Sequence, residues 1–230
     1  IYKEKIIELS DDFSVSTNFV DCPEHLQRRI KNYSILLKKE FEHYSKVNFD
    51  EPFRIFLSLV FHRLENFQLN NKGYESFNEF LEDMEIFQNS VNDVFGNNFR
   101  ISKLDDFVDY VKQFEFHGVT LDIRQNSSII NSKKGKIYKD FINLIKEIPE
   151  LQHIYGQKVF NSIILSMTKS HQDMLNLFNL CNSLIPDKNI PTLTPLIEEI
   201  EDLQSSHLIL NEILKDKKYN KFIKTFKSNN

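Results

Sequence analysis

Two differently patterned halves of this chain meet at Gly118-Val119-Thr120-Leu121-Asp122-Ile123-Arg124-Gln125. Within this stretch apolar side chains alternate with polar ones, which is the two-residue period of a β-strand. Before it, apolar residues recur at steps of three and four, which is the period of an amphipathic helix. The stretch therefore predicts a strand at the point where a helical half gives way to a mixed one.

The half that precedes this strand is expected to consist of helices. One stripe of apolar side chains predicts a single helix over residues 24–45. Pro52 has the place that proline prefers in a first helical turn, and it opens the next helix. Ser76 and Glu79 have the spacing of a capping box, so another helix is expected to begin there. Residues 1–115 are therefore interpreted as a helical region.

The second half is expected to contain three strand-and-helix units. A lysine- and serine-rich loop over residues 126–136 and a helix over 138–148 are predicted to follow the first strand. The other strands are predicted at 159–167 and 193–197. Alternating strands and helices are typical of a parallel sheet, and three units are too few to close a barrel. We expect a mainly α protein with a small parallel β component, in which residues 116–230 form part of a (β/α)8-type barrel.

The composition argues against several classes of protein. Hydrophobic residues make up 40% of the chain and charged residues 27%, as in a globular domain. The net charge is −4 and the lysines are spread among carboxylates, so nucleic-acid binding is not expected. No apolar run approaches the length of a membrane span, and the chain does not start like a signal peptide. Cys22 and Cys181 lack the spacing of a metal site or a disulfide framework. Because this fits a reducing compartment, a cytoplasmic location is expected.

Arg124 is the first candidate for a functional residue. Reactive side chains of β/α barrels lie at the carboxyl ends of the strands, and this position is one such end. The chain contains six arginines and 23 lysines, so an arginine here is unusual. A guanidinium group can bind a phosphate or carboxylate through two parallel hydrogen bonds. The alternative is an ion pair with Asp122, two residues earlier on the same strand face, without any ligand.

Glu198 is the second candidate, because it follows the third predicted strand. A carboxylate at a strand end is suited to Mg²⁺, which proteins hold through one or two carboxylates together with water and substrate oxygens. The alternative is an acidic first turn of a helix, which complements the helix dipole. We prefer that alternative for Glu199, Glu201 and Asp202. No histidine pair, serine elbow or phosphate-binding loop is present in the sequence, so no catalytic residue is named.

Four segments resemble phosphoenolpyruvate carboxylases in the same order along the chain. Residues 121–127, Leu-Asp-Ile-Arg-Gln-Asn-Ser, resemble the family's Leu-Asp-Ile-Arg-Gln-Glu-Ser segment. Residues 164–170 and 173–175 are similar to its Val-Ile-Ser-Met-Ala strand and the Ser-Asp-Val-Leu that follows. Residues 194–203 are similar to its Pro-Leu-Phe-Glu-Thr-Leu-Asp-Asp-Leu segment, and residues 51–54 to its Glu-Pro-Tyr-Arg.

The resemblance implies an enzyme that carboxylates phosphoenolpyruvate with bicarbonate, giving oxaloacetate and phosphate with the help of Mg²⁺ or Mn²⁺. It implies that Arg124 binds the phosphate or carboxylate of the substrate and that Glu198 is one of two acidic metal ligands. It also implies an eight-stranded barrel in a homo-oligomer, commonly a tetramer.

Several parts of the family pattern are missing from this sequence. The segments with the family's catalytic histidine and its second metal ligand have no counterpart, and the stretch between Arg124 and Ile164 is shorter than expected. We therefore expect an internal fragment or a shortened, diverged member that supplies only part of an active site. The alternative is a catalytically inactive helical scaffold or interaction protein, in which Arg124 and Glu198 are structural ion-pair residues.

Overall fold

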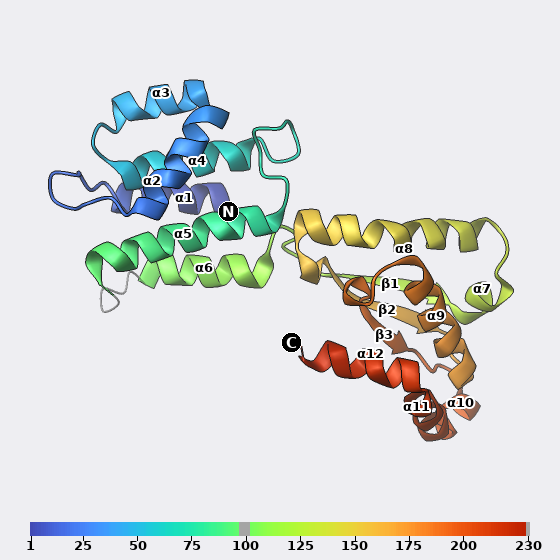
Figure 1. Ribbon diagram of the computed structural model, residues 1–230. Helices are drawn as coiled ribbons and strands as arrows, with labels where there is room; N and C mark the ends of the chain where they lie inside the picture. The colour runs from blue at the N-terminus through green and yellow to red at the C-terminus, as the bar shows by residue number, and fades with distance from the viewer. Residues whose placement is uncertain (97–101, 229–230) are drawn as a thin grey trace. The chain divides into compact units, whose positions relative to one another are not determined.

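The computed structural model describes residues 1–96 and 102–228 (Figure 1). The chain divides into two compact units, Ile1–Phe116 and His117–Asn230. The first unit is helical throughout its described part, and the second is built on a three-stranded parallel sheet. The expected mainly α fold with a small parallel β component is thus confirmed.

The first unit contains six described helices. Pro52 begins the fourth helix, and the hydroxyl of Ser76 accepts a hydrogen bond from the backbone N–H of Glu79 at the start of the fifth, as the sequence predicts. The helices are α1 (Tyr2–Asp12), α2 (Glu24–Leu36), α3 (Lys38–Val47), α4 (Pro52–Glu65), α5 (Phe77–Phe95) and α6 (Ser102–Phe114).

Phenylalanine side chains fill the core of the first unit. The ring of Phe87 on α5 makes edge-to-face contacts with Phe13 and Phe53, at centroid distances of 5.0 and 5.9 Å, and stacks on Phe56 at 6.0 Å. All four side chains are almost completely buried. Aromatic pairs with these geometries add to the free energy that burial of their area supplies, so this cluster ties α1, α4 and α5 together.

The single helix expected over residues 24–45 is wrong, because the chain bends at Leu37. This residue has non-helical backbone angles, φ −118° and ψ 48°, and it separates α2 from α3. Its side chain is completely buried, so the bend keeps Leu37 in the core while α3 carries no buried residue. Neither glycine nor proline marks the bend, and the apolar stripe continues through it.

The second unit begins with strand β1 and alternates between strands and helices. Its elements are β1 (Leu121–Asn126), α7 (Ser127–Ser132), α8 (Lys136–Tyr155), the 3-10 turn η1 (Gln157–Val159), β2 (Phe160–Ser166), α9 (His171–Leu184), η2 (Asp187–Asn189), β3 (Thr192–Pro195), α10 (Ile200–Gln204), α11 (Ser206–Lys215) and α12 (Lys217–Ser228). Figure 1 shows the three strands side by side in the order β1, β2, β3, and all pairings are parallel.

The connection between the first two strands differs from the prediction. The expected loop over residues 126–136 contains α7, which begins where the side chain of Asn126 caps the backbone N–H of Ser128 at 2.8 Å. The expected helix over 138–148 extends to Tyr155 and contains Pro149. Ile148 is buried at the predicted end and Gln152 is buried beyond it, so packing of this face outweighs the hydrogen bond that proline removes.

The two faces of the sheet have different chemistry. In the register of the strands, Ile123 lies beside Ile163 and Ile163 beside Leu193, and all three pack in the core with residues of α8, α9, α11 and α12. Neighbours along each strand point to the opposite face. That face carries Arg124, aligned with Ile164, and Thr194 on β3. The polar face of the sheet therefore ends at the carboxyl edge, where the candidate residues Arg124 and Glu198 lie.

Candidate functional site

Arg124 and Glu198 lie together at the carboxyl edge of the sheet. Nη2 of Arg124 donates a hydrogen bond to Oε1 of Glu198 at 2.8 Å, although the residues are 74 positions apart in the sequence. The side chains remain 57% and 33% exposed. The two strand-end residues singled out in the sequence thus form one charged pair that solvent can reach.

The alternative expected for Arg124, an ion pair with Asp122, is wrong. Asp122 lies beside Ser162 in the strand register, and Oδ1 of Asp122 accepts hydrogen bonds from Ser162 Oγ at 2.7 Å and from Asn161 Nδ2 at 3.1 Å. The hydrogen bond from Ser162 is the main cause that lowers the pKa of Asp122. The short aspartate side chain is therefore held by the neighbouring strand, and Arg124 reaches the more distant Glu198.

Met167 connects the ends of β2 and β3. Its backbone N–H donates to Oε2 of Glu198 at 3.0 Å, and its carbonyl accepts from the hydroxyl of Ser127 at 2.6 Å. Met167 has φ 55°, a left-handed conformation that is costly for a residue with a side chain. Two hydrogen bonds therefore hold a strained residue beside the charged pair.

The hydroxyl groups at the end of β2 bond to backbone carbonyls. Ser166 donates to the carbonyl of Gln125 at 3.3 Å, and Thr168 donates to that of Leu165 at 2.7 Å. Both residues are buried, with exposures of 6% and 0%. They therefore stabilise the turn after β2, and nothing in their geometry indicates a nucleophile.

A second ion pair flanks the first. Nζ of Lys169 lies 2.7 Å from Oε2 of Glu199, and this hydrogen bond is the main cause that raises the pKa of Lys169. Glu201 and Asp202 lie in the first turn of α10, as expected for acidic residues near a helix N-terminus. The carboxyl edge of the sheet thus carries two cationic side chains, Arg124 and Lys169, together with several carboxylates that follow β3.

Sequence reasoning found the charged pair but missed its supports. Ser127 lies inside the segment that resembles the family, yet nothing in the sequence shows that its hydroxyl reaches across to Met167. Methionine is also not a residue type that favours positive φ, unlike glycine or asparagine. No local signal in the sequence could have identified this turn.

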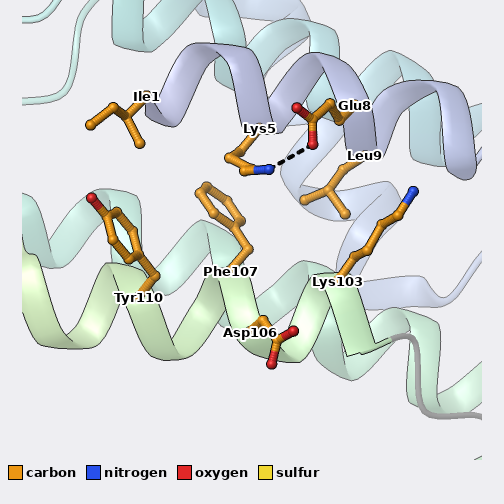
Figure 2. Close-up of a pocket in the computed structure, with 8 residues that line it drawn as sticks. All are labelled: Ile1, Lys5, Glu8, Leu9, Lys103, Asp106, Phe107 and Tyr110. Atoms are coloured by element: carbon orange, nitrogen blue, oxygen red, sulfur yellow. Dashed lines mark hydrogen bonds and ion pairs between the residues drawn. The ribbon is translucent and has the colours of Figure 1, made fainter.

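A separate pocket of about 400 Å³ lies between α1 and α6 in the first unit (Figure 2). Leu9, Phe107 and Tyr110 give it apolar walls, and Lys5 is paired with Glu8 at 2.8 Å on its rim. It contains none of the candidate residues named from the sequence. The proposed function does not involve this pocket.

Two further properties bear on the classes considered from composition. No helix in the part of the chain that the structure describes is long and apolar enough to cross a membrane. Cys22 and Cys181 are free thiols, and burial raises the pKa of both, that of Cys22 to about 11 and that of Cys181 to about 12. Neither cysteine lies at the carboxyl edge of the sheet.

The sequence profile of the family described as phosphoenolpyruvate carboxylase matches residues 1–139 and 129–229. The chain belongs to the phosphoenolpyruvate carboxylase family. The resemblance drawn from four short segments is thereby confirmed, and the two matches together cover almost the whole chain.

Curated relatives named phosphoenolpyruvate carboxylase show how far the similarity extends. The chain is 21% identical to the protein of Prochlorococcus marinus (strain MIT 9301), with 90% of this chain and 28% of that protein aligned. It is 20% identical to the Synechococcus protein and 21% identical to that of Nostoc, and each alignment covers 92% of this chain and 26% of the relative. The chain therefore spans about a quarter of the length of these relatives.

The comparisons also show that the chain has fewer residues than the region of its relatives with which it aligns. The alignment with the Prochlorococcus protein runs over 280 positions, more than the 230 residues of the whole chain. The two profile matches overlap at residues 129–139. This overlap lies in α7, in the short connection that follows it and at the start of α8, within the stretch from Arg124 to Ile164 that the sequence leads us to expect to be short.

Proposed function

We propose that this chain supplies part of the active site of a phosphoenolpyruvate carboxylase, which carboxylates phosphoenolpyruvate with bicarbonate to give oxaloacetate and phosphate. One observation carries the proposal: Arg124 and Glu198, 74 positions apart, meet at 2.8 Å at the carboxyl edge of a parallel sheet. Ligands bind at this edge in open α/β sheets and barrels. The names of the curated relatives support the same activity.

Arg124 is proposed to bind the phosphate or carboxylate of phosphoenolpyruvate. Among the described residues, its guanidinium donates a hydrogen bond only to Glu198, through one of its nitrogens. The remaining N–H groups can donate in parallel to two oxygens of an anion. An exposure of 57% lets a dissolved substrate reach them.

Glu198 is proposed to be one ligand of a Mg²⁺ or Mn²⁺ ion. Its Oε1 accepts from Arg124 and its Oε2 from the N–H of Met167, which leaves further lone pairs on both oxygens. No group of three or more histidine, cysteine or acidic residues that could hold a metal lies in the described part of the chain. One carboxylate with water and substrate oxygens suits Mg²⁺, and the ion would supply positive charge to substrate oxygens.

The three strands are proposed to form part of the eight-stranded barrel of the family. In this arrangement the polar face with Arg124 and Thr194 would line the barrel interior, and the helices would cover the apolar face. The family also supports a cytoplasmic homo-oligomer, with residues outside this chain completing the site.

The test is calorimetric titration of the 230-residue chain with phosphoenolpyruvate in the presence of Mn²⁺. Loss of a charge-assisted hydrogen-bond donor should weaken binding by about 10- to 100-fold in Arg124→Ala. Arg28→Ala is the matched control, because Arg28 also pairs with an exposed glutamate, Glu24, but lies in the helical unit. Equal binding by wild type and Arg124→Ala would contradict the proposal.

The second candidate function is a catalytically inactive scaffold or interaction protein derived from the family. It is favoured by the direct contact of Arg124 with Glu198, because each charge already has a partner without any ligand. The stretch between Arg124 and Ile164, which the sequence leads us to expect to be shorter than in the family, favours it as well. In that case phosphoenolpyruvate and Mn²⁺ would show no saturable binding to the wild-type chain.

A further inference from the structure

Glu198 is held in place by more than its ion pair with Arg124. The carboxylate accepts a second hydrogen bond from the backbone N–H of Met167, at 3.0 Å. A backbone donor fixes the direction of a carboxylate only if the backbone itself cannot turn. The position of Glu198 therefore depends on what holds Met167.

Nothing in the methionine side chain itself favours the backbone conformation of Met167. Its φ of 55° is left-handed, and of the five described residues other than glycine with positive φ, Met167 alone follows the end of a strand in the sheet. A strained backbone persists where the surrounding structure over-determines it, and such residues cluster at functional sites. The surrounding contacts should therefore reveal which group maintains the strain.

The hydroxyl of Ser127 provides the contact on the other side of Met167. It donates to the carbonyl of Met167 at 2.6 Å and is 7% exposed, so water does not readily replace it. Ser127 is itself fixed, because α7 is tied to α9 by the hydrogen bonds from Asn131 to Asp173 at 2.7 Å and from Asn176 to Asn131 at 2.9 Å. The hydrogen bonds thus form a chain from Ser127 through Met167 to Glu198.

We infer that Ser127 is a positioning residue that orients the carboxylate of Glu198 for a divalent cation, acting through the backbone of Met167. The inference rests on the proposed function of Glu198 as a metal ligand. Groups that orient metal ligands by hydrogen bonds commonly change metal affinity when they are replaced. Ser127 itself touches neither the cation nor the substrate.

The test combines two measurements on the full 230-residue chain. Amide hydrogen exchange of Met167 reports whether its N–H stays bonded to Glu198, without any metal. Titration with Mn²⁺, followed by the paramagnetic signal of the free ion, reports affinity. Ser127→Ala is expected to speed exchange of the Met167 amide and to weaken Mn²⁺ binding about 10-fold. Ser128→Ala is the matched control, because Ser128 is exposed and should change neither quantity.

A second pair of variants guards against a folding defect. Ser127→Thr keeps the hydroxyl and Ser127→Val replaces it with a methyl group of similar size. The inference expects Thr to retain, and Val to lose, both the slow exchange and the Mn²⁺ affinity. A merely steric role would affect Thr and Val equally and would overturn the inference.

The remaining outcomes separate this inference from the proposed function. Unchanged exchange at Met167 in Ser127→Ala and Ser127→Val overturns the positioning role whatever the Mn²⁺ affinity. Faster exchange with unchanged Mn²⁺ affinity also overturns it, provided that Glu198→Gln does weaken binding. If Glu198→Gln binds Mn²⁺ as tightly as wild type, the proposed function of Glu198 fails and the inference fails with it.

Discussion

Asp83 is completely buried in the helical unit and is surrounded by hydrogen-bond donors. The hydroxyls of Tyr33 and Tyr74 both donate to its Oδ2, and Nε of Arg29 lies 3.1 Å from its Oδ1. Arg63 donates to Tyr33 Oη at 2.7 Å. Burial raises the pKa of Asp83 to about 6, in spite of these donors, which lower it.

The raised pKa of Asp83 predicts that protonation stabilises this unit. The folded state binds this proton more tightly than the unfolded chain, whose aspartates titrate near pH 4, so the contribution is present below pH 4 and is lost as the pH rises through 6. Relative to Asp83→Asn, wild type should lose about 2–3 kcal/mol of stability between pH 4 and pH 7. Urea unfolding followed by the amide signals of α5 measures this difference.

Asp106→Asn is the control for this titration, because Asp106 is an exposed aspartate of the same unit. Its stability curve should run parallel to that of wild type over the same pH range. A parallel curve for Asp83→Asn as well would show that Asp83 has the same pKa in the folded and unfolded states.

Arg124 and Arg63 should contribute very differently to stability. The pair of Arg124 with Glu198 is exposed to solvent, so Arg124→Ala should change the free energy of unfolding by less than about 1 kcal/mol. Arg63 is 2% exposed and bonds to Glu79, Tyr33 and backbone carbonyls, so Arg63→Ala should cost about 3–5 kcal/mol. Chemical denaturation measures both. A large loss in Arg124→Ala would instead favour a structural ion pair.

At the residue scale the sequence pointed to the two charged residues at the strand ends, but not to the contacts that hold them. Arg124 and Glu198 were accessible to reasoning because strand ends and residue types can be read from a sequence. Met167 and Ser127 were not, because their roles depend on a left-handed backbone and a contact across 40 positions. The same applies to Asp83, whose partners come from two separate segments, α2 and the chain just before α5.

Helix α9 begins with a capping box formed by Ser170 and Asp173. Oδ2 of Asp173 accepts from the backbone N–H groups of Ser170 and Lys169 at 2.9 and 3.0 Å, and its Oδ1 accepts from Asn131. Asp173→Ala should therefore destabilise the second unit by about 2 kcal/mol. Asn179→Ala, at an exposed position of the same helix, should be close to neutral in thermal unfolding. Equal effects would show that this cap contributes nothing specific.

Helix α8 contains a proline where the sequence predicted an end. Pro149 cannot donate to the carbonyl of Ile145, so Pro149→Ala should restore that hydrogen bond and stabilise the chain by about 1–2 kcal/mol. Glu150→Ala, at the next and exposed position, controls for helix propensity. A lower melting temperature for Pro149→Ala would indicate that the proline ring itself is needed for packing.

At the element scale, helices with local signals were predicted and those set by packing were not. Pro52 and Ser76 mark helix starts through their own chemistry, and both predictions are confirmed. The bend at Leu37 and the continuation of α8 past Pro149 oppose the local signals. Leu37 is completely buried, and Gln152 is buried beyond the proline. α7 was missed because a polar, six-residue helix resembles a loop.

The whole molecule consists of two units, each with its own core. The first unit buries its aromatic side chains among its own helices, so we predict that residues 1–116 fold when produced alone. Circular dichroism should show helical structure that melts in one cooperative transition. A spectrum without helical structure, or a gradual melt, would show that this unit depends on the rest of the chain.

In the second unit, the edges of the sheet are not covered by the described strands. Its sheet contains three described strands in the order β1, β2, β3, so β1 and β3 each have one edge without a strand partner among the described residues. Such edges are usually covered or paired in native proteins. The sequence predicted the parallel sheet from alternating elements, but it could not show what covers the edges of the sheet, because the pattern within a strand does not identify its neighbours.

Binding of a divalent cation by Glu198 is the central claim, and Mn²⁺-induced broadening of amide NMR signals tests it most directly. The amide of Met167 is bonded to Glu198, so Mn²⁺ should broaden its signal strongly in wild type and in Glu199→Gln, but not in Glu198→Gln. If Mn²⁺ does not broaden the Met167 signal in wild type, there is no metal site at Glu198. Equal broadening of that signal in wild type and in Glu198→Gln would contradict the site as well.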